Sequence, residues 1–260
     1  METYGAGEPL LLLHGNSQSI YAFTNQIGEL AKHFKVIAVD TRGQGKSKDH
    51  ATGPLSYEMF ADDMKAMLDS LHIQKTNILV WSDGGNTGLI LAMKYPQYVN
   101  RLAVMGANLF PADKAVKRST LNELTNAIDN LKARTDPRAI RQLRLFSLLL
   151  NEPNIDESNL KKIQCPSLIM AGENDIILEA HTRAIASGIS DSKLVIFKKA
   201  THYAPVEKKK AFNQTVLKFF KSGSIPKDRK SESGLLWPVD DSQRKIFDHK
   251  AVNTAFLTLT

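Results

Sequence analysis

Short apolar runs recur along the chain, separated by longer segments in which apolar residues return every three or four positions. These runs are continuously apolar rather than alternating, which is typical of parallel strands covered by helices on both faces. They comprise residues 10–13, 36–39, 78–81, 102–105, 167–171 and 193–197. The pattern therefore predicts an α/β fold with a mostly parallel, doubly wound sheet and right-handed crossovers.

The segments between the apolar runs predict helices. The segment 57–71 places its apolar side chains on one face, and Ser56 is suited to cap its first turn. A second helix is expected over 85–95, because Pro96 cannot continue it. A third helix is expected over 207–220.

The alternation of strands and helices breaks between residues 108 and 162, where only helical periods remain. We expect 108–162 to be a helical cap inserted into a core formed by 1–107 and 163–221. From residue 222 the chain becomes low in hydrophobic residues, which is typical of a linker. We therefore interpret 222–260 as a linker and C-terminal extension, to which the sequence assigns no role.

Composition excludes several classes of protein. The chain has 260 residues, 42% of them apolar, which suffices for one compact domain. The net charge of +7 comes from basic residues interleaved with acids, so no nucleic-acid groove is expected. A single cysteine, Cys165, indicates a reducing compartment. No signal-peptide profile or membrane-length apolar run is present, so we expect a soluble cytoplasmic protein without a membrane partner.

The sharpest chemical signal is the sequence Val-Trp-Ser-Asp-Gly-Gly at 80–85. It joins an apolar run directly to a helical segment, which predicts a strand, a tight turn and a helix. A serine at such an apex, here Ser82, is held in a strained conformation that exposes its hydroxyl as a nucleophile. The next amide, that of Asp83, lies at a helix N-terminus and can stabilise an oxyanion.

A serine nucleophile needs a base and an acid, and both follow later predicted strands. Asp175 follows the run that ends at Ala171, and His202 follows the run that ends at Phe197. Loops at the carboxyl ends of parallel strands meet at one edge, so we predict that Ser82, His202 and Asp175 form a catalytic triad. Glu173 and Asp113 are poorer acids by position.

The turn after the first apolar run supplies the expected second oxyanion donor, the amide of Asn16. His14, just before it, is interpreted as a structural histidine that holds the turn. Asp83 has two interpretations, because its carboxylate beside the nucleophile could bind a substrate ammonium group. The alternative, which we favour at this stage, is an acid stabilised by the helix dipole.

These motifs together resemble those of the α/β-hydrolase family from residue 7 to about residue 220. The shared features are the His-Gly-Asn turn at 14–16, the loop at 40–47, the Ser-Asp-Gly-Gly elbow, the acid loop at 172–175 and His202. The elbow is similar to that of small carboxylesterases, including hydrolases of amino-acid esters. The resemblance implies a cap over the site that determines substrate choice.

The chain departs from that family pattern at two points besides the unmatched tail. Val80 stands where the family usually has glycine, so we expect crowding in the elbow. The chain also begins only nine residues before Leu10, so N-terminal edge strands of the family sheet are expected to be missing.

The sequence therefore predicts a serine hydrolase that cleaves a small carboxylic ester through an acyl-enzyme. The triad requires no cofactor, and no spacing indicates a metal site. Two alternatives remain open. The same triad could act on an amide, a lactone or a carbon–carbon bond, or the chain could be a catalytically feeble ligand-binding protein of the same fold. The oligomeric state does not follow from the sequence.

Overall fold

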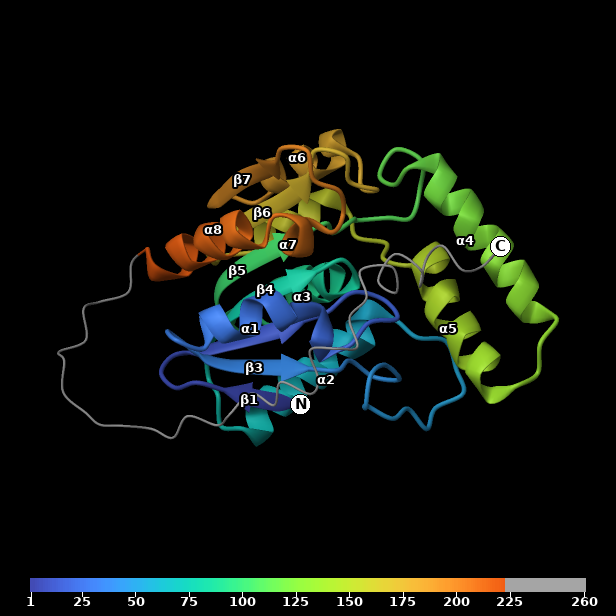
Figure 1. The fold of residues 1–260 in the computed structure, drawn as a ribbon, viewed down its shortest axis with the longest axis horizontal. Coiled ribbons are helices and arrows are strands. Elements are labelled where there is room, and N and C mark those ends of the chain that lie inside the picture. The colour runs from blue at the N-terminus through green and yellow to red at the C-terminus, as the bar shows by residue number, and fades with distance from the viewer. Residues whose placement is uncertain (223–260) are drawn as a thin grey trace. The chain divides into compact units, whose positions relative to one another are not determined.

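A computed structural model describes residues 1–222, which form a sheet flanked by helices (Figure 1). The seven strands lie in the order β1-β3-β2-β4-β5-β6-β7. All neighbouring pairs are parallel except β1 and β3. The strands are β1 (Glu2–Tyr4), β2 (Pro9–Leu13), β3 (Lys35–Val39), β4 (Thr76–Trp81), β5 (Val99–Met105), β6 (Ser167–Gly172) and β7 (Ser192–Phe197). Every apolar run identified in the sequence lies within one of β2 to β7, which confirms the predicted fold class.

The helices cover the sheet and form the inserted segment. They are η1 (Ile20–Phe23), α1 (Thr24–Leu30), α2 (Tyr57–Ser70), α3 (Asp83–Lys94), η2 (Pro96–Tyr98), α4 (Arg118–Lys132), α5 (Pro137–Asn151), η3 (Glu157–Lys162), α6 (Glu179–Gly188), α7 (Ala204–Glu207) and α8 (Lys209–Lys221). Ser56 caps α2 as predicted, because its side chain accepts a hydrogen bond from the amide of Met59. The single helix predicted over 207–220 is wrong in one respect, since it is divided into α7 and α8 at Lys208.

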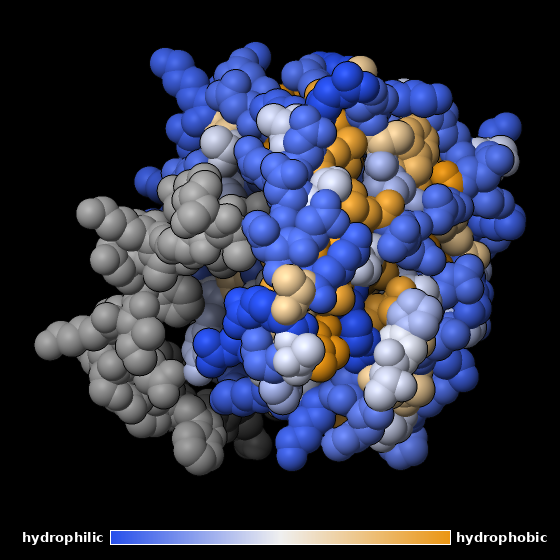
Figure 2. All heavy atoms as spheres, turned by 90° about the vertical axis from the view of Figure 1, so that its right-hand side faces the viewer, coloured by the Kyte–Doolittle hydropathy of each residue, from blue (hydrophilic) through white to orange (hydrophobic). Residues whose placement is uncertain are grey.

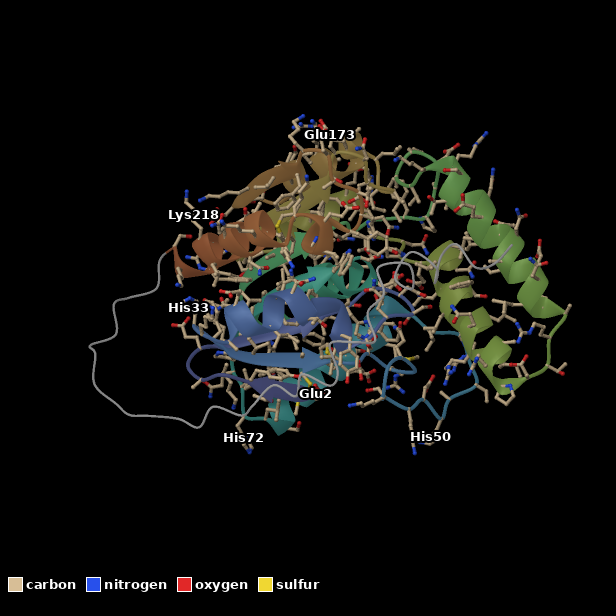
Figure 3. The ribbon with its side chains drawn as sticks, viewed as in Figure 1. Glu2, His33, His50, His72, Glu173 and Lys218 are labelled. Atoms are coloured by element: carbon tan, nitrogen blue, oxygen red, sulfur yellow. The ribbon has the colours of Figure 1, made fainter. Side chains whose placement is uncertain are left out.

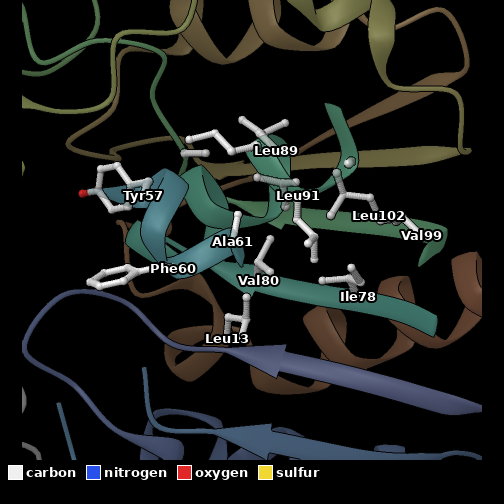
Figure 4. Packing of buried hydrophobic residues seen from close by; sticks show 14 of the residues in the cluster. Leu13, Tyr57, Phe60, Ala61, Ile78, Val80, Leu89, Leu91, Val99 and Leu102 are labelled. Atoms are coloured by element: carbon white, nitrogen blue, oxygen red, sulfur yellow. The ribbon is translucent and has the colours of Figure 1, made fainter. Parts of the chain in front are cut away.

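Successive side chains of each central strand point to opposite faces of the sheet, which explains why the runs are apolar at every position. On β2, Leu10 and Leu12 belong to the core under α1 and α8, whereas Leu11 and Leu13 belong to the core under α2, α3 and α6. Figure 4 shows part of this second core, with Leu13, Ile78 and Val80 directed towards α2 and α3. The sheet is thus buried on both sides.

The N-terminal edge holds a single short strand. β1 pairs antiparallel with β3 over three residues. The hydrophobic pattern gave no indication of β1, because its side chains are only partly buried or exposed. The N-terminal edge strands of the family sheet were expected to be missing, and one short antiparallel strand, β1, is present at this edge. Among residues 1–222, no helix is both long enough and apolar enough to cross a lipid bilayer.

Residues 108–162, called the cap segment below, contain the helices α4, α5 and η3 and no strand. The helices α4 and α5 pack on each other through an apolar cluster that includes Leu124, Ile128 and Phe146. The start of the cap segment is joined to the loop after β6 by an isolated bridge between Val116 and Ile177. In Figure 2, the side of the molecule that carries these helices shows apolar side chains between polar ones. Residues 223–260 of the predicted tail lie outside the described residues.

Candidate active site

Ser82 occupies the sharp turn between β4, which ends at Trp81, and α3, which begins at Asp83. Its backbone angles, a φ of 56° and a ψ of −120°, lie in the positive-φ region, where residues other than glycine have a strained backbone. The turn is held in this conformation by a hydrogen bond from the Ser82 amide to the carbonyl of Met105, at 2.8 Å. The structure thus gives Ser82 the strained elbow geometry that the sequence predicted.

Two glycines of α3 make room for the elbow. A Cβ at Gly84 would lie 2.2 Å from the carbonyl oxygen of Leu13, so only glycine allows α3 to approach β2 so closely. A Cβ at Gly88 would lie 3.0 Å from both methyl carbons of Val80. The Val80 side chain, which was expected to crowd the elbow, therefore occupies space that Gly88 leaves open.

Asp175 and His202 form a buried pair at the carboxyl ends of β6 and β7. The Nδ1 atom of His202 lies 2.6 Å from Oδ1 of Asp175. Backbone amides of Gly172 and Ile177 also donate to the Asp175 carboxylate. Burial by itself would raise the pKa of Asp175, but the His202 charge and these hydrogen bonds hold it below its usual value. The pair therefore has the arrangement of a carboxylate that orients a histidine.

Contacts from β4 and β5 bring the His202 ring to the same edge as Ser82. The indole nitrogen of Trp81 donates a 2.9 Å hydrogen bond to the His202 carbonyl. Gly106 directly follows the residue that holds the Ser82 amide, and a Cβ there would lie 2.6 Å from Cε1 of His202. No hydrogen bond joins Ser82 to His202 in this structure, since the buried Nε2 atom of His202 has no partner among residues 1–222.

The two residues that carry the predicted oxyanion donors, Asn16 and Asp83, are in contact through their side chains. Asp83 is the first residue of α3, so its amide has no acceptor within the helix. The Asn16 side chain donates a 2.8 Å hydrogen bond from Nδ2 to Oδ2 of Asp83. The turn that carries Asn16 is therefore fixed to the elbow beside Ser82.

The Asp83 carboxylate is buried beside the nucleophile, and this burial raises its pKa to about 6. The hydrogen bond from Asn16, an interaction with Tyr57 and the charge of His202 act in the opposite direction. Tyr57 lies at the start of α2, and its pKa is raised well above the usual value by burial and by Asp83. The Asp83 carboxylate is thus poorly solvated. Neither of the two interpretations from the sequence, a site for a substrate ammonium group or an acid stabilised by the helix dipole, had included this burial.

His14 is engaged at both ring nitrogens. Nδ1 lies 2.7 Å from the Gly15 carbonyl, and Nε2 accepts a hydrogen bond from the Thr41 amide at 3.2 Å. Burial lowers the pKa of His14, which favours the neutral ring that these bonds require. This geometry agrees with the structural interpretation of His14.

The two poorer acid candidates lie away from His202. Glu173 points outward from the molecule (Figure 3) and pairs with Lys198 at 2.7 Å. Asp113 forms an exposed ion pair with Arg118 at 2.9 Å. Of the three acids considered in the sequence, Asp175 alone contacts the histidine.

Sequence reasoning missed contacts that the cap segment makes with the oxyanion turn. The Leu145 carbonyl accepts a hydrogen bond from Asn16, and Gln142 donates one to Ser17. These partners are separated by more than one hundred positions along the chain. No local pattern marks them, because they meet only when α5 is in place.

Two family models match the sequence. The model described as the alpha/beta hydrolase fold matches residues 8–131, which include the oxyanion turn and the elbow. The model described as TAP-like protein matches residues 150–232, which include Asp175 and His202. The five candidate site residues therefore all fall within matched segments.

Curated relatives are similar over most of the described chain. The human serine hydrolase BPHL is 29% identical over 187 residues, which cover 66% of this chain and 64% of the human protein. The chain thus spans slightly less than two thirds of that relative. A 2-hydroxy-6-oxononadienedioate/2-hydroxy-6-oxononatrienedioate hydrolase of Escherichia coli is 29% identical, with 82% of this chain and 86% of that protein covered.

Solved structures extend the likeness to three dimensions. A hydrolase from Pseudomonas aeruginosa is 26% identical and superposes with a TM-score of 0.69. The superposition covers 85% of this chain and 93% of that one. Together with the seven-stranded sheet, the strained elbow and the ordered motifs, these matches show that the chain belongs to the α/β-hydrolase family.

Proposed function

We propose that the chain hydrolyses a small carboxylic ester by acyl transfer, with Ser82 as nucleophile, His202 as base and Asp175 as the orienting acid. The observation that carries the proposal is the buried Asp175–His202 hydrogen bond beside a serine at positive φ. With Nδ1 bonded to Asp175, the neutral ring keeps its lone pair on Nε2. That atom has no other partner among the described residues, so it is free to accept the serine proton.

The proposed reaction has two balanced steps. Ser82 Oγ attacks the ester carbonyl while its proton passes to Nε2 of His202, and the amides of Asn16 and Asp83 stabilise the oxyanion. The alcohol then leaves with the proton that His202 returns. Water repeats the sequence on the acyl-enzyme, with His202 again as base, and releases the carboxylic acid.

The test is intact-mass analysis after treatment with a fluorophosphonate, which labels an activated serine. We expect a single adduct on the wild type and none on Ser82→Ala. Turnover of p-nitrophenyl acetate should fall by several orders of magnitude in Ser82→Ala, because the covalent route is removed. Retention of turnover by that variant would sink the assignment of the nucleophile.

The relatives leave the bond type open. The name of the Escherichia coli relative gives a hydroxy-oxo dicarboxylate as substrate, which is not an ester. The human relative is described only as a serine hydrolase. A panel of ester, amide, lactone and β-diketone substrates separates these reactions, and we expect the largest kcat/KM for small esters.

The competing hypothesis, a feeble ligand-binding protein, draws on Val80, the short N-terminus and the unmatched tail. The space left open by Gly88 supports an elbow that tolerates this valine. A folded wild type that a small ester stabilises thermally, yet that neither reacts with fluorophosphonate nor turns over any panel substrate, would favour the binding protein.

We further propose that Asp83 contributes to substrate choice by attracting a cationic group. Its carboxylate is buried next to Ser82, and its hydrogen bond comes from the neutral side chain of Asn16 rather than from a cation. An ester with a free α-ammonium group should therefore have a higher kcat/KM than its N-acetylated counterpart. Asp83→Asn should remove this preference, whereas an unchanged ratio in that variant would contradict the role.

Two further proposals concern the inserted segment and the cellular compartment. We propose that residues 108–162 act as a cap over the site, supported by the contacts of α5 with Asn16 and Ser17. We also propose a reducing cytoplasm as the compartment, supported by the single cysteine, Cys165, which is buried and unpaired.

A further inference from the structure

The side chain of Asn16 joins three parts of the molecule. Its Nδ2 atom donates to the Asp83 carboxylate at 2.8 Å and to the Leu145 carbonyl of α5 at 3.0 Å. An amide nitrogen has two hydrogens, so both are used. The turn that carries a proposed oxyanion donor is therefore fastened to the elbow on one side and to the cap segment on the other.

A second connection runs through Ser17. Its hydroxyl donates to Oδ1 of Asn16 at 2.7 Å and accepts a hydrogen bond from Nε2 of Gln142 at 2.8 Å. We call these two bonds the Gln142–Ser17–Asn16 relay. With the relay in place, every donor and acceptor group of the Asn16 amide has a partner.

The backbone at Ser17 does not hold this arrangement by itself. Its φ of 57° lies in the left-handed region, which serine rarely adopts. The Ser17 amide is bound by Oε1 of Gln44 at 2.6 Å. The turn therefore keeps its conformation through contacts with other segments, which makes it sensitive to the loss of one of them.

The helix α5 is docked so that it can provide these contacts. Gln142 and Leu145 are three positions apart and hence lie on one face of the helix. On the same segment, Arg144 pairs with Asp49 at 2.8 Å and donates to the Gly53 carbonyl. Figure 1 shows α5 between α4 and the sheet. The helix is thus anchored to the core beside the oxyanion turn as well as at the loop after β3.

We propose that Gln142 is a positioning residue that, together with the Leu145 carbonyl, aligns the Asn16 amide for catalysis. This inference rests on the proposed acyl-transfer function. Displacement of α5 removes both of its contacts with the turn, and among residues 1–222 it leaves the Asn16 side chain with Asp83 as its only partner outside the turn. Oxyanion stabilisation then depends on how the cap segment is seated, so a substrate that displaces α5 is bound but is turned over slowly.

The test compares two replacements of Gln142 that have similar length but differ in their ability to donate. Gln142→Met removes the donor, and Gln142→Lys keeps one for Ser17. With p-nitrophenyl acetate as probe, Gln142→Met should lower kcat about fivefold, the effect expected for one lost hydrogen bond. KM should stay within about twofold, because this small ester needs little of the cap. Gln142→Lys should restore most of kcat.

Controls separate positioning from a general loss of packing. Arg141→Met, an exposed position on the same helix, should leave kcat unchanged. Ser17→Ala combined with Gln142→Met should be no slower than Ser17→Ala alone, because both remove one relay. A Gln142→Met variant with normal kcat, or with a loss that Gln142→Lys does not restore, would overturn the inference.

A measurement that does not depend on activity distinguishes this inference from the proposed function. Hydrogen exchange of a peptide covering residues 14–18 should be faster in Gln142→Met than in the wild type and Arg141→Met. If exchange is faster in Gln142→Met but fluorophosphonate does not label the wild type, the relay is supported and the acyl-transfer function is rejected. Unchanged exchange would reject the relay even in a fully active enzyme.

Discussion

At the scale of the residue, the site combines two carboxylates whose surroundings shift their pKa values in opposite directions. Burial raises the pKa of Asp83 to about 6, whereas the His202 charge and hydrogen bonds hold that of Asp175 below its usual value. Two carboxylates within one site thus differ because one faces a histidine and the other faces the neutral amide of Asn16. Such separation is typical of sites in which each group has its own role.

The raised pKa of Asp83 predicts a cost in stability at neutral pH. The folded chain binds the Asp83 proton more tightly than the unfolded chain, so the stability associated with this group is present below about pH 4 and is lost as the pH rises through about 6. Asp83→Asn should therefore raise the free energy of unfolding at pH 8 by about 2 kcal/mol, and by less at pH 5.

Urea denaturation at both values of pH measures this difference. Asp129→Asn, which removes an exposed carboxylate on α4, serves as the control and should change the stability by less than about 0.5 kcal/mol. A gain for Asp83→Asn that is equal at the two values of pH would show that ionisation of the carboxylate is not its cause.

At the scale of the element, the elbow depends on how closely α3 approaches the sheet. Gly84 allows the helix to pass the backbone of β2, and Gly88 leaves space for the side chain of Val80. Val80 lies on β4 in the core that α2 and α3 cover (Figure 4). Val80, which stands where the family usually has glycine, is therefore accommodated by Gly88, eight positions later on the helix that faces it.

Gly88→Ala tests this pairing. In the wild type the added methyl group crowds both Val80 methyls and Leu102, so we expect a net loss of about 1 kcal/mol in unfolding free energy. In a Val80→Ala background the two closest contacts, those with the Val80 methyls, are gone, and the longer contact with Leu102 remains. The higher helix propensity of alanine then dominates. The same change should then stabilise the protein by up to about 1 kcal/mol. Chemical denaturation of the four proteins gives the cycle, and a stabilising Gly88→Ala in both backgrounds would contradict the pairing.

At the scale of the whole molecule, the order of motifs along the chain was enough to predict the strands β2 to β7, although not β1, and the contact between the acid and histidine loops. The apolar runs became β2 to β7, and the acid and histidine loops met at one edge because parallel strands share their direction. Contacts between distant segments could not be predicted in this way. Gln142 approaches Ser17 only through the docking of α5, and Gly88 matches Val80 only through the packing of α3 on β4.

Two buried histidines, His14 and His181, are expected to make the folded state less stable in acid. Burial lowers the pKa of both His14 and His181, and Nε2 of His181 accepts a hydrogen bond from the Leu109 amide at 3.0 Å. The unfolded chain therefore binds these protons more readily, so stability is lost as the pH falls below about 6.5. The double variant His14→Gln, His181→Gln should lose less stability than the wild type between pH 7.5 and pH 6.

Urea midpoints at pH 7.5 and pH 6 give the change in stability with pH. Other titrating groups contribute equally to the wild type and to the double variant, so they cancel in the comparison. His50→Gln is the matched control, because this side chain is exposed and points into solvent (Figure 3). It should leave the slope of the wild type unchanged. Equal slopes for all three proteins would exclude the buried histidines as the source of acid sensitivity.

The hydrogen bond from Trp81 to the His202 carbonyl gives the protein an internal optical reporter. The indole lies 6.3 Å from the His202 ring and 5.6 Å from the ring of Tyr203, so its excited state is sensitive to the position of that loop. The sequence has one other tryptophan, Trp237. With Trp237 replaced by phenylalanine, emission from a chromophore fixed on the central strand follows the histidine loop during a single turnover, without any attached label.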